Sequence, residues 1–267
     1  MIDIDGYLGR LGVVRPASPD AEALRTLQLA HIERIPFENA DVLGGRPIVL
    51  DPEALVERLT EPGSRGGGFC YQLNGAFAVL LQALGYSVDR LAARFHGDVR
   101  MEPRFGHMAL RVKVDGAAWL ADVGAGYSFR APLQLQTGLD QDDPSGRFRI
   151  QRAADGPVPP AGDDPPDALD VMWRHRDGVF RPHYRFEPAP ASLDDFVAPC
   201  DWARTAPDSP FTQDWICAIG TVGGWATLDG RRLRVTGADL DRIDAELIDA
   251  TAPAAALDRW FGVEPPV

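Results

Sequence analysis

The spacing of apolar residues changes along this 267-residue chain from a helical period to a strand period. Up to about residue 84, apolar residues recur every three or four positions, as on one face of an α-helix. Helix starts fall at Ser18-Pro19 and Asp51-Pro52, where a capping side chain precedes a first-turn proline. His31 follows on the apolar face and is expected to be partly buried. The pattern therefore predicts that residues 1–84 are helical.

From about Tyr86 the apolar period shortens to two, which is typical of strands with one buried face. Strands are expected over residues 87–93, 108–114, 117–122 and 148–150. Asp115-Gly116 is a strong two-residue hairpin signal between the second and third of these strands. Residues 139–168 are rich in Asp, Pro and Gly, so we expect them to form a loop and the most mobile stretch of the chain.

The hairpin predicts which side chains lie together on the sheet. If Val114 pairs with Ala117 across the two-residue turn, His107 and Asp122 become diagonal neighbours on one face, about 5–8 Å apart between Cβ atoms. An aspartate in that position can accept a hydrogen bond from the imidazole and fix its tautomer.

The last part of the chain mixes helix and hairpin signals. They are a return to the sheet over residues 174–186, a capping box at Ser192-Leu193-Asp194-Asp195, a hairpin turn at Asp229-Gly230, and two short helices over residues 239–249 and 255–261.

Composition excludes several classes of protein. With 27 basic and 39 acidic residues the net charge is −12, which argues against nucleic-acid binding and requires a local arginine cluster for any anionic ligand. No segment approaches the length of a membrane span, and the first residues lack a signal-peptide pattern. Three cysteines are too few and too scattered for a disulfide scaffold or a zinc site, and Cys200 and Cys217 are expected to be partly buried thiols. We expect a cytoplasmic protein without a metal.

The strongest chemical signal is the stretch from Arg65 to Phe77. Gly66-Gly67-Gly68 leads through Phe69 into Cys70, and apolar spacing then predicts a helix that starts at Cys70 and that Gly85 ends. At a helix start the dipole favours a thiolate, and glycines leave room for a substrate against the backbone. No Gly-Lys-Ser/Thr follows, so the glycines are not a phosphate loop.

This stretch resembles the active-site signature of the arylamine N-acetyltransferase family, in which Arg-Gly-Gly-aromatic-Cys-aromatic-Glu/Gln-x-Asn carries the nucleophile. The family has an arginine four residues before the cysteine, where this chain has Gly66, and Arg65 lies one position earlier. Residues 35–39 and 205–211 also resemble the family, so the resemblance runs over most of the chain. In the family the glutamate of the first string pairs with an early arginine; the matching residues are Glu38 and Arg10.

The resemblance implies an α+β fold in three parts. Residues 1–84 would form a helical bundle carrying the nucleophile, residues 85–186 a central antiparallel β-barrel carrying the histidine and the aspartate, and residues 187–267 a mixed α/β lid. A cysteine nucleophile at a helix start is also similar to that of papain-like hydrolases.

The expected catalytic residues are Cys70, His107 and Asp122. His107 would take the thiol proton, and Asp122 would orient and stabilise the imidazolium. The sulfur would attack an acyl thioester, an amine would then take the acyl group with His107 accepting its proton, and the N–H of Cys70 would stabilise each oxyanion. The remaining histidines are expected to be surface or structural residues: His96, His175 and His183.

The implied reaction is ping-pong transfer of an acetyl group from acetyl-CoA, as a substrate and not a resident cofactor, to an arylamine or hydrazine. The expected substrate pocket consists of Phe37, Phe69, Gly124, Ala125 and Gly126. Ala125 replaces a phenylalanine that lines the family's acceptor pocket, which suits a bulkier substrate. The alternatives are therefore an amide synthase that takes a polyketide-type acyl group from an acyl carrier protein and, more distantly, a thiol hydrolase.

Coenzyme A, if it binds, needs positive charge near the cleft for its phosphates. The candidate arginines for this role are Arg94, Arg100 and Arg104. The other expected partner is a small-molecule amine; a membrane is not expected.

Overall fold

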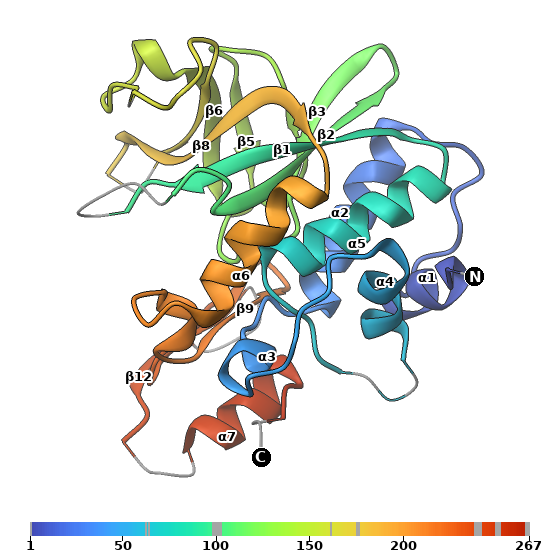
Figure 1. The fold of residues 1–267 in the computed structure, drawn as a ribbon, viewed down its shortest axis with the longest axis vertical. Coiled ribbons are helices and arrows are strands. Elements are labelled where there is room, and N and C mark those ends of the chain that lie inside the picture. Colours follow the sequence, from blue (N-terminus) through green and yellow to red (C-terminus); the bar gives the residue numbers. More distant parts are fainter. Residues whose placement is uncertain are drawn as a thin grey trace.

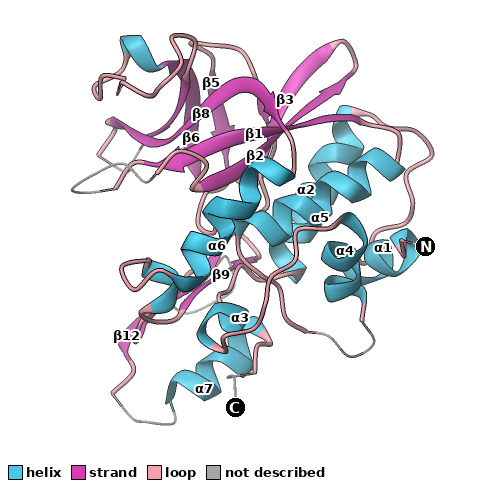
Figure 2. Cartoon of the chain, viewed as in Figure 1, coloured by secondary structure: helices cyan, strands magenta, loops and turns pink. Residues whose placement is uncertain are grey.

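The computed structural model describes residues 2–61, 63, 65–97, 103–160, 162–174, 177–237, 242–248 and 252–264. Helices at the N-terminus, a large sheet and a smaller C-terminal sheet make up the fold (Figure 1, Figure 2). The N-terminal helices are α1 (Ile4–Leu11), α2 (Ala21–Arg34), α3 (Ala40–Leu43), α4 (Pro52–Thr60) and α5 (Cys70–Ala83). In Figure 1 the large sheet lies at the top, and α1, α2, α4 and α5 lie below it on the right.

Side-chain caps set the starts of α2 and α4. Asp51 accepts from the backbone N–H groups of Glu53 (2.9 Å) and Ala54 (3.1 Å), as its sequence position predicts. The start predicted at Ser18 is wrong by two residues, because the capping side chain is Asp20, which accepts from the N–H of Ala23 at 2.7 Å.

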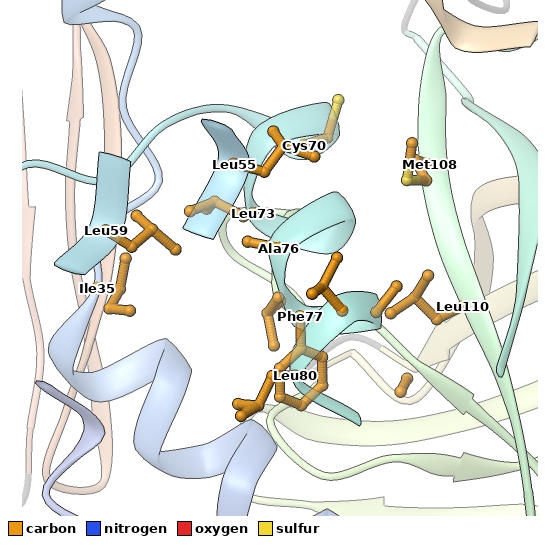
Figure 3. Close-up of a cluster of buried hydrophobic side chains, with 14 of the residues drawn as sticks. Ile35, Leu55, Leu59, Cys70, Leu73, Ala76, Phe77, Leu80, Met108 and Leu110 are labelled. Atoms are coloured by element: carbon orange, nitrogen blue, oxygen red, sulfur yellow. The ribbon is translucent and has the colours of Figure 1, made fainter. Parts of the chain in front are cut away.

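Helix α5 is the centre of the larger hydrophobic core. Every residue from Cys70 to Leu81 is buried, and the helix packs against α4 and against strand β2 (Figure 3). Leu73, Ala76, Phe77 and Leu80 point into this cluster, whereas the sulfur of Cys70 projects away from it. The predicted helix from Cys70 to Gly85 is confirmed, since Gly85 follows α5 with a positive φ of 94°.

The large sheet is a nearly closed antiparallel barrel, which confirms the expected fold class. Its eight strands run in the order β4-β3-β2-β1-β8-β7-β6-β5. They are β1 (Ser87–Phe95), β2 (His107–Val114), β3 (Ala117–Ala121), β4 (Leu133–Gln134), β5 (Asp140–Asp143), β6 (Gly146–Arg152), β7 (Leu169–Arg174) and β8 (Phe180–Ala191). The two edge strands approach each other: the N–H of Gln134 donates to the side chain of Gln141 (2.7 Å), and the Gln141 amide donates to the Gln134 carbonyl (3.1 Å).

The register of the β2–β3 hairpin is the predicted one. Val114 pairs with Ala117, and Leu110 pairs with Ala121. His107 begins β2 and Asp122 directly follows β3, so both lie at the same end of this hairpin.

Two expectations for the barrel are corrected. Residues 139–168 are not one loop, because β5 and β6 form a hairpin within them. The aspartates that made this stretch look like a loop lie opposite arginines across the hairpin, as in the pairs Asp140–Arg149 and Asp142–Arg147. The boundary expected at residue 186 falls inside β8, which runs to Ala191.

The C-terminal part contains α6 and a four-stranded antiparallel sheet. The elements are α6 (Val197–Thr205), β9 (Ile216–Thr221), β10 (Gly224–Asp229), β11 (Arg232–Val235), β12 (Ile243–Glu246) and α7 (Ala252–Ala256), with short helical turns at Asp194–Phe196, Pro210–Thr212 and Leu257–Phe261. The capping box is present, since Ser192 and Asp195 exchange hydrogen bonds, and Asp229 pairs with Arg232 across the expected hairpin.

The helix expected over residues 239–249 is wrong in its described part. Residues 243–246 form β12, because Ile243 and Leu247 pack on the C-terminal core while the intervening residues pair with β11. Among the described residues no helix is long and apolar enough to cross a membrane.

His31 is fully buried in α2, not partly buried as expected, and its Nε2 lies 2.8 Å from the hydroxyl of Tyr7. Burial lowers the pKa of this histidine from 6.5 to about 3. Below pH 6.5 the unfolded chain therefore binds a proton at this position that the folded chain does not. The stability that His31 supports is complete above pH 6.5 and is lost as the pH falls towards 3.

We therefore expect the wild-type protein to lose about 2 kcal/mol more unfolding free energy than the variant His31→Gln between pH 7 and pH 5. Urea unfolding of both proteins at both pH values gives the loss of unfolding free energy of each. Comparing the two losses removes any destabilisation by the substitution that does not depend on pH. Equal losses in the two proteins would mean that His31 does not titrate in this way.

Candidate active site

Cys70 is the first residue of α5 and is only 3% exposed. The N–H of Phe69 donates to Oε1 of Gln72 (3.2 Å), so a side chain from the first turn caps the helix start. Position 67 must be a glycine because two chain segments touch there: a Cβ on Gly67 would lie 1.7 Å from the carbonyl oxygen of Pro36. These contacts hold the sulfur at the positive end of the helix dipole.

His107 and Asp122 are joined by a buried hydrogen bond. Nε2 of His107 lies 2.7 Å from Oδ2 of Asp122, and the two residues are 1% and 2% exposed. Burial by itself would raise the pKa of the Asp122 carboxyl, but the charge of His107 and hydrogen bonds from His107, Asn74 and Gly124 lower it below its usual value. Asp122 is therefore a carboxylate that orients the imidazole.

The carboxylate also selects the histidine tautomer. Because Asp122 can only accept, Nε2 of His107 carries the proton. Nδ1 of His107 is buried and has no hydrogen-bond partner among the described residues. This ring nitrogen is therefore available to accept a proton.

The first turn of α5 lies between the segments that carry His107 and Asp122. Sγ of Cys70 is 3.9 Å from the carbonyl oxygen of Gly106, the residue before His107. On the other side, a Cβ on Gly124 would lie only 2.7 Å from Cα of Cys70. The three residues expected from the sequence to act together thus come from α5, β2 and the end of β3 and meet in one place.

Two residues beside this group had no role assigned from the sequence. Asn74, one turn after Cys70, donates to Oδ1 of Asp122 (2.8 Å) and to the carbonyl of Met108 (2.6 Å). It belongs to the cysteine motif, so its place in the string was a signal. Tyr184 packs its ring against His107 at 5.4 Å, and burial together with Asp122 raises the pKa of its hydroxyl well above the usual value. Nothing in the sequence around Tyr184 indicates this position.

The residues expected to line a substrate pocket differ in exposure. Ala125 and Gly126 are half-buried, and a Cβ on Gly126 would lie 3.9 Å from the ring of Phe37. Phe69 is fully buried. Its ring packs edge-on against Phe211 at 5.4 Å, and Phe211, not Phe69, is among the residues that line a cavity here. Phe211, which lies in one of the resembling strings, is the aromatic residue that the expectation omitted.

The other described histidines have structural partners. His96 lies 3.3 Å from Asp170, and His183 lies 2.9 Å from the hydroxyl of Ser128. The side chain of His96 is 7% exposed, so it is structural and not a surface residue. His175 lies outside the described residues.

Arg65 does not take the place of the arginine missing at position 66. Its side chain is 62% exposed and pairs with Asp258 at 2.9 Å. A Cβ on Gly66, in contrast, would point towards Oε1 of Glu38 at 3.6 Å and the guanidinium of Arg58 at 3.9 Å.

The guanidinium beside Gly66 comes from α4. Arg58 donates from Nε to the carbonyl of Gly67 (2.8 Å) and from Nη2 to Oε1 of Glu38 (3.0 Å), and it pairs with Asp41 at 2.8 Å. Asp41 in turn accepts from the amide of Gln72 at 3.1 Å. Arg58 thereby connects the glycine run to the first turn of α5.

The expected pairing of Glu38 with Arg10 is corrected, because the arginine that hydrogen-bonds Glu38 is Arg58. Arg10 donates to the carbonyl oxygens of Leu59 (2.7 Å) and Gly66, and its charge acts on Glu38 from a greater distance. Sequence spacing does not show that α4 is the nearer helix.

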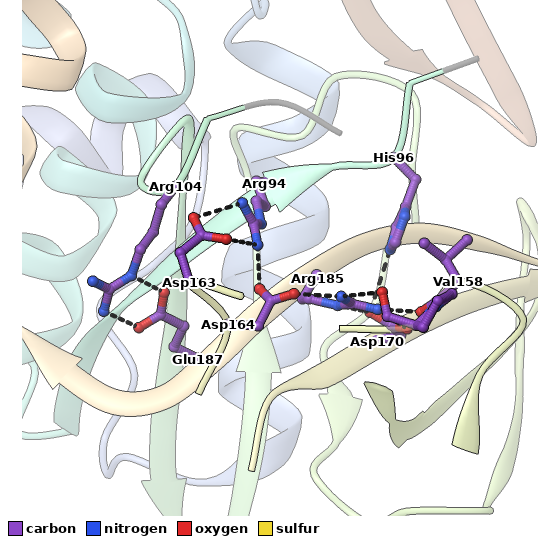
Figure 4. A network of polar contacts seen from close by, with 10 residues as sticks. Arg94, His96, Arg104, Val158, Asp163, Asp164, Asp170, Arg185 and Glu187 are labelled. Carbon is purple, nitrogen blue, oxygen red and sulfur yellow. Dashed lines mark hydrogen bonds and ion pairs between the residues drawn. The ribbon is translucent and has the colours of Figure 1, made fainter. Parts of the chain in front are cut away.

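Two of the arginines considered for coenzyme A already have carboxylate partners (Figure 4). Arg94 binds Asp163 and Asp164, and Arg104 binds Glu187 with an Nη2–Oε2 distance of 2.6 Å. Arg100 lies outside the described residues. The network of Figure 4 attaches the segment around Asp163 to the barrel and leaves these charges compensated.

The other two cysteines are unsuited to nucleophilic chemistry. Burial raises the pKa of Cys200 to about 12 and raises that of Cys217 well above its usual value, so both remain protonated. Within the described part of the chain, no group of three or more His, Cys, Asp or Glu residues could hold a metal ion.

Comparison with known proteins agrees with this arrangement. A family described as N-acetyltransferase matches residues 20–265. The arylamine N-acetyltransferase of Mycolicibacterium smegmatis is 33% identical over 88% of this chain and 82% of the relative. The arylamine N-acetyltransferase / N-hydroxyarylamine O-acetyltransferase of Salmonella typhimurium is 41% identical over 84% of this chain and 76% of the relative.

Solved structures match over nearly the whole chain. The arylamine N-acetyltransferase of Mycobacterium marinum superposes with a TM-score of 0.86 and 30% identity, covering 98% of this chain and 93% of the other. The same enzyme in complex with CoA gives a TM-score of 0.85 with the same identity and coverage.

The contacts of Arg58 predict that acylation needs a guanidinium group at this place, whichever segment of the chain supplies it. We expect Arg58→Ala to slow acylation of Cys70 about 10–100-fold, because the glycine run and the first turn of α5 lose their connection. Adding Gly66→Arg to that variant should restore most of the rate, since residue 66 has space for a side chain and faces Glu38. The measurement is the rate at which the intact protein gains one acetyl group from acetyl-CoA, followed by mass spectrometry.

Glu57→Ala, on the exposed side of the same helix, is the matched control and should acylate like wild type. If adding Gly66→Arg does not restore the acylation rate, although Arg58→Ala and the double variant both melt at the wild-type temperature, Arg58 does not act through the glycine run.

Proposed function

The chain belongs to the arylamine N-acetyltransferase family, and we propose that it transfers an acetyl group from acetyl-CoA to the nitrogen of an arylamine or hydrazine through an acetyl-cysteine at Cys70. The observation that carries this proposal is the buried His107–Asp122 hydrogen bond beside a cysteine at a helix start. The names of the relatives in M. smegmatis and S. typhimurium support the substrates.

In the first half-reaction, Nδ1 of His107 takes the thiol proton of Cys70. The thiolate attacks the carbonyl carbon of acetyl-CoA, the bond from that carbon to the coenzyme sulfur breaks, and the imidazolium returns its proton to the departing thiolate. Asp122 stabilises the imidazolium in between. The N–H of Cys70, in the first turn of α5 at the positive end of the helix dipole, stabilises the oxyanion.

In the second half-reaction the amine attacks the acetyl carbon. His107 accepts the proton that the amine loses, the bond from carbon to Sγ breaks, and the thiol is restored. The relatives in M. smegmatis and S. typhimurium are acetyltransferases by name, which argues against a hydrolase. No observation favours a carrier-bound acyl group over acetyl-CoA, so the amide synthase is not proposed.

We expect Asp122→Asn to slow formation of the acetyl-enzyme about 10³–10⁴-fold, because an amide can support the wrong tautomer of His107. Asp89→Asn, in a barrel ion pair away from the cysteine, is the control and should acylate normally. The adduct should vanish in Cys70→Ala and persist in Cys200→Ala. An adduct that survives Cys70→Ala would disprove the proposed nucleophile.

The nucleotide end of acetyl-CoA needs a site with uncompensated positive charge. We propose a groove, here called the Tyr127 groove, between the barrel and the C-terminal sheet; it has a volume of about 1100 Å³ and continues into a smaller hollow of about 380 Å³. Its aromatic residues are Tyr127, Trp173 and Trp225, and its arginines are Arg174, Arg181, Arg234 and Arg242. Tyr127 is three residues after Gly124, which lies against Cys70, so the Cα atoms of Tyr127 and Gly124 are at most about 10 Å apart.

Charge favours this groove over the network of Figure 4. Among the described residues that line the groove are four arginines and one carboxylate, Asp177, which pairs with Arg181 (2.6 Å); Asp244, next to the lining, approaches Arg234 (3.7 Å). The excess positive charge can attract phosphates to a protein whose net charge is −12. Exposed rings such as Tyr127, which is 47% exposed, can stack on an adenine.

We expect Arg234→Ala combined with Arg242→Ala to raise KM for acetyl-CoA about tenfold with little change in kcat, and the effect should shrink at high salt. Steady-state kinetics at two salt concentrations measures it. Arg15→Ala, at an exposed ion pair near the N-terminus, is the control. An unchanged KM in the double variant would place the nucleotide elsewhere.

A further inference from the structure

A second hollow, of about 460 Å³, lies on the α6 side of the nucleophile. It is here called the α6 hollow. Its inner end is formed by Tyr71 and Gly106; Tyr71 follows Cys70, and the Gly106 carbonyl lies 3.9 Å from Sγ. The hollow therefore reaches the residues beside the sulfur, and it shares no lining residue with the Tyr127 groove.

The walls of the α6 hollow are mainly apolar. One wall is the face of α6 with Ala198, Pro199, Trp202 and Ala203, and another includes Phe211. Trp202 is 39% exposed although it is a large aromatic side chain, and its exposed surface borders this hollow. Such a wall fits a flat hydrophobic ligand.

The segment that contributes Gly106 to the hollow is held in place before any ligand binds. The hydroxyl of Tyr71 donates to the carbonyl of Phe105 (2.8 Å), and the Phe105 ring packs on Phe196 at 5.2 Å. Phe105 has a positive φ of 63°, a conformation that costs energy for a residue other than glycine. Strain of this kind, maintained by several contacts, is typical of functional sites.

The size of the hollow distinguishes between classes of amine. A cavity of about 150 Å³ already holds one benzene ring, whereas pockets of about 300–1,000 Å³ hold drug-sized ligands. The charged residues at the rim are Arg104, whose charge Glu187 compensates, and the exposed carboxylate of Asp208. The rim therefore disfavours anions.

We propose that the α6 hollow binds the ring system of the acceptor and selects uncharged arylamines with two or more fused rings over single-ring amines. Trp202 is the main specificity-determining residue, since it offers its face to the ring system beyond the reacting nitrogen. This inference rests on the proposed function, because it concerns the amine that discharges the acetyl-enzyme.

The test compares discharge of the acetyl-enzyme by 2-aminoanthracene and by aniline. We expect wild type to prefer 2-aminoanthracene in kcat/KM, and Trp202→Ala to reduce the ratio of the two kcat/KM values about tenfold. Ala198→Phe, which fills the hollow, should reduce the same ratio at least as much. Val197→Phe adds the same ring on an exposed position of α6 outside the hollow and should leave the ratio unchanged.

A separate comparison tests whether the rim of the hollow disfavours anionic amines. 6-Aminonaphthalene-2-sulfonate should discharge wild type poorly compared with 2-naphthylamine, and Asp208→Asn should narrow that gap several-fold.

The outcomes separate the two proposals. If the acetyl-enzyme forms but Trp202→Ala and Ala198→Phe keep the wild-type ratio, the α6 hollow does not bind the acceptor and the proposed function stands. If no acetyl-enzyme forms at all, the proposed function itself fails.

Discussion

The position of Cys70, the proposed nucleophile, depends on one buried carboxylate. Glu38 is 1% exposed and accepts hydrogen bonds from the backbone of Gly67 (3.1 Å) and from Arg58 (3.0 Å). Burial raises the pKa of this carboxyl against the effect of Arg58 and the backbone donors, so its charge is maintained only by these partners. The N–H of Glu38 also donates to the carbonyl of Gly68 (2.9 Å). The glycine run is thus fixed from both sides directly before α5 begins.

The neighbouring residues extend this junction to the C-terminal sheet. Phe37 exchanges backbone hydrogen bonds with Ala218 at 2.8 and 2.9 Å. Asn39 donates to the carbonyls of Phe211 and Asp214, both at 2.8 Å. Residues 35–39 therefore set the position of the cysteine loop and of Phe211 together. A displacement of the C-terminal sheet would therefore disturb both Phe211 and the glycine run before Cys70.

Much of the fold and of the site could be predicted from the sequence because local signals were sufficient. The turn at Asp115-Gly116 fixed a register, and the register placed His107 near Asp122 before any tertiary contact was known. Helix α5 was recognisable from its apolar spacing and its terminal glycine.

The errors arose where distant residues decide the outcome. The aspartates of β5 look like loop residues until the arginines of β6 lie opposite them. The arginine that hydrogen-bonds the glycine run is Arg58, which lies on α4, whereas the motif itself contains only Arg65, which pairs with Asp258. Tyr184 and Trp202 reach the site from segments more than 70 residues beyond His107 or Cys70 in the sequence, and no local pattern marks them.

The two hollows have opposite chemistry, and this suits a reaction in which one sulfur meets two different substrates. The Tyr127 groove has an excess of arginines and exposed rings, whereas the α6 hollow is apolar with a carboxylate at its rim. A polyanionic donor is attracted to the first and repelled by the second, and a neutral polycyclic amine gains apolar burial mainly in the second. The two proposed binding regions therefore share no lining residue, so the two substrates do not compete for the same surface.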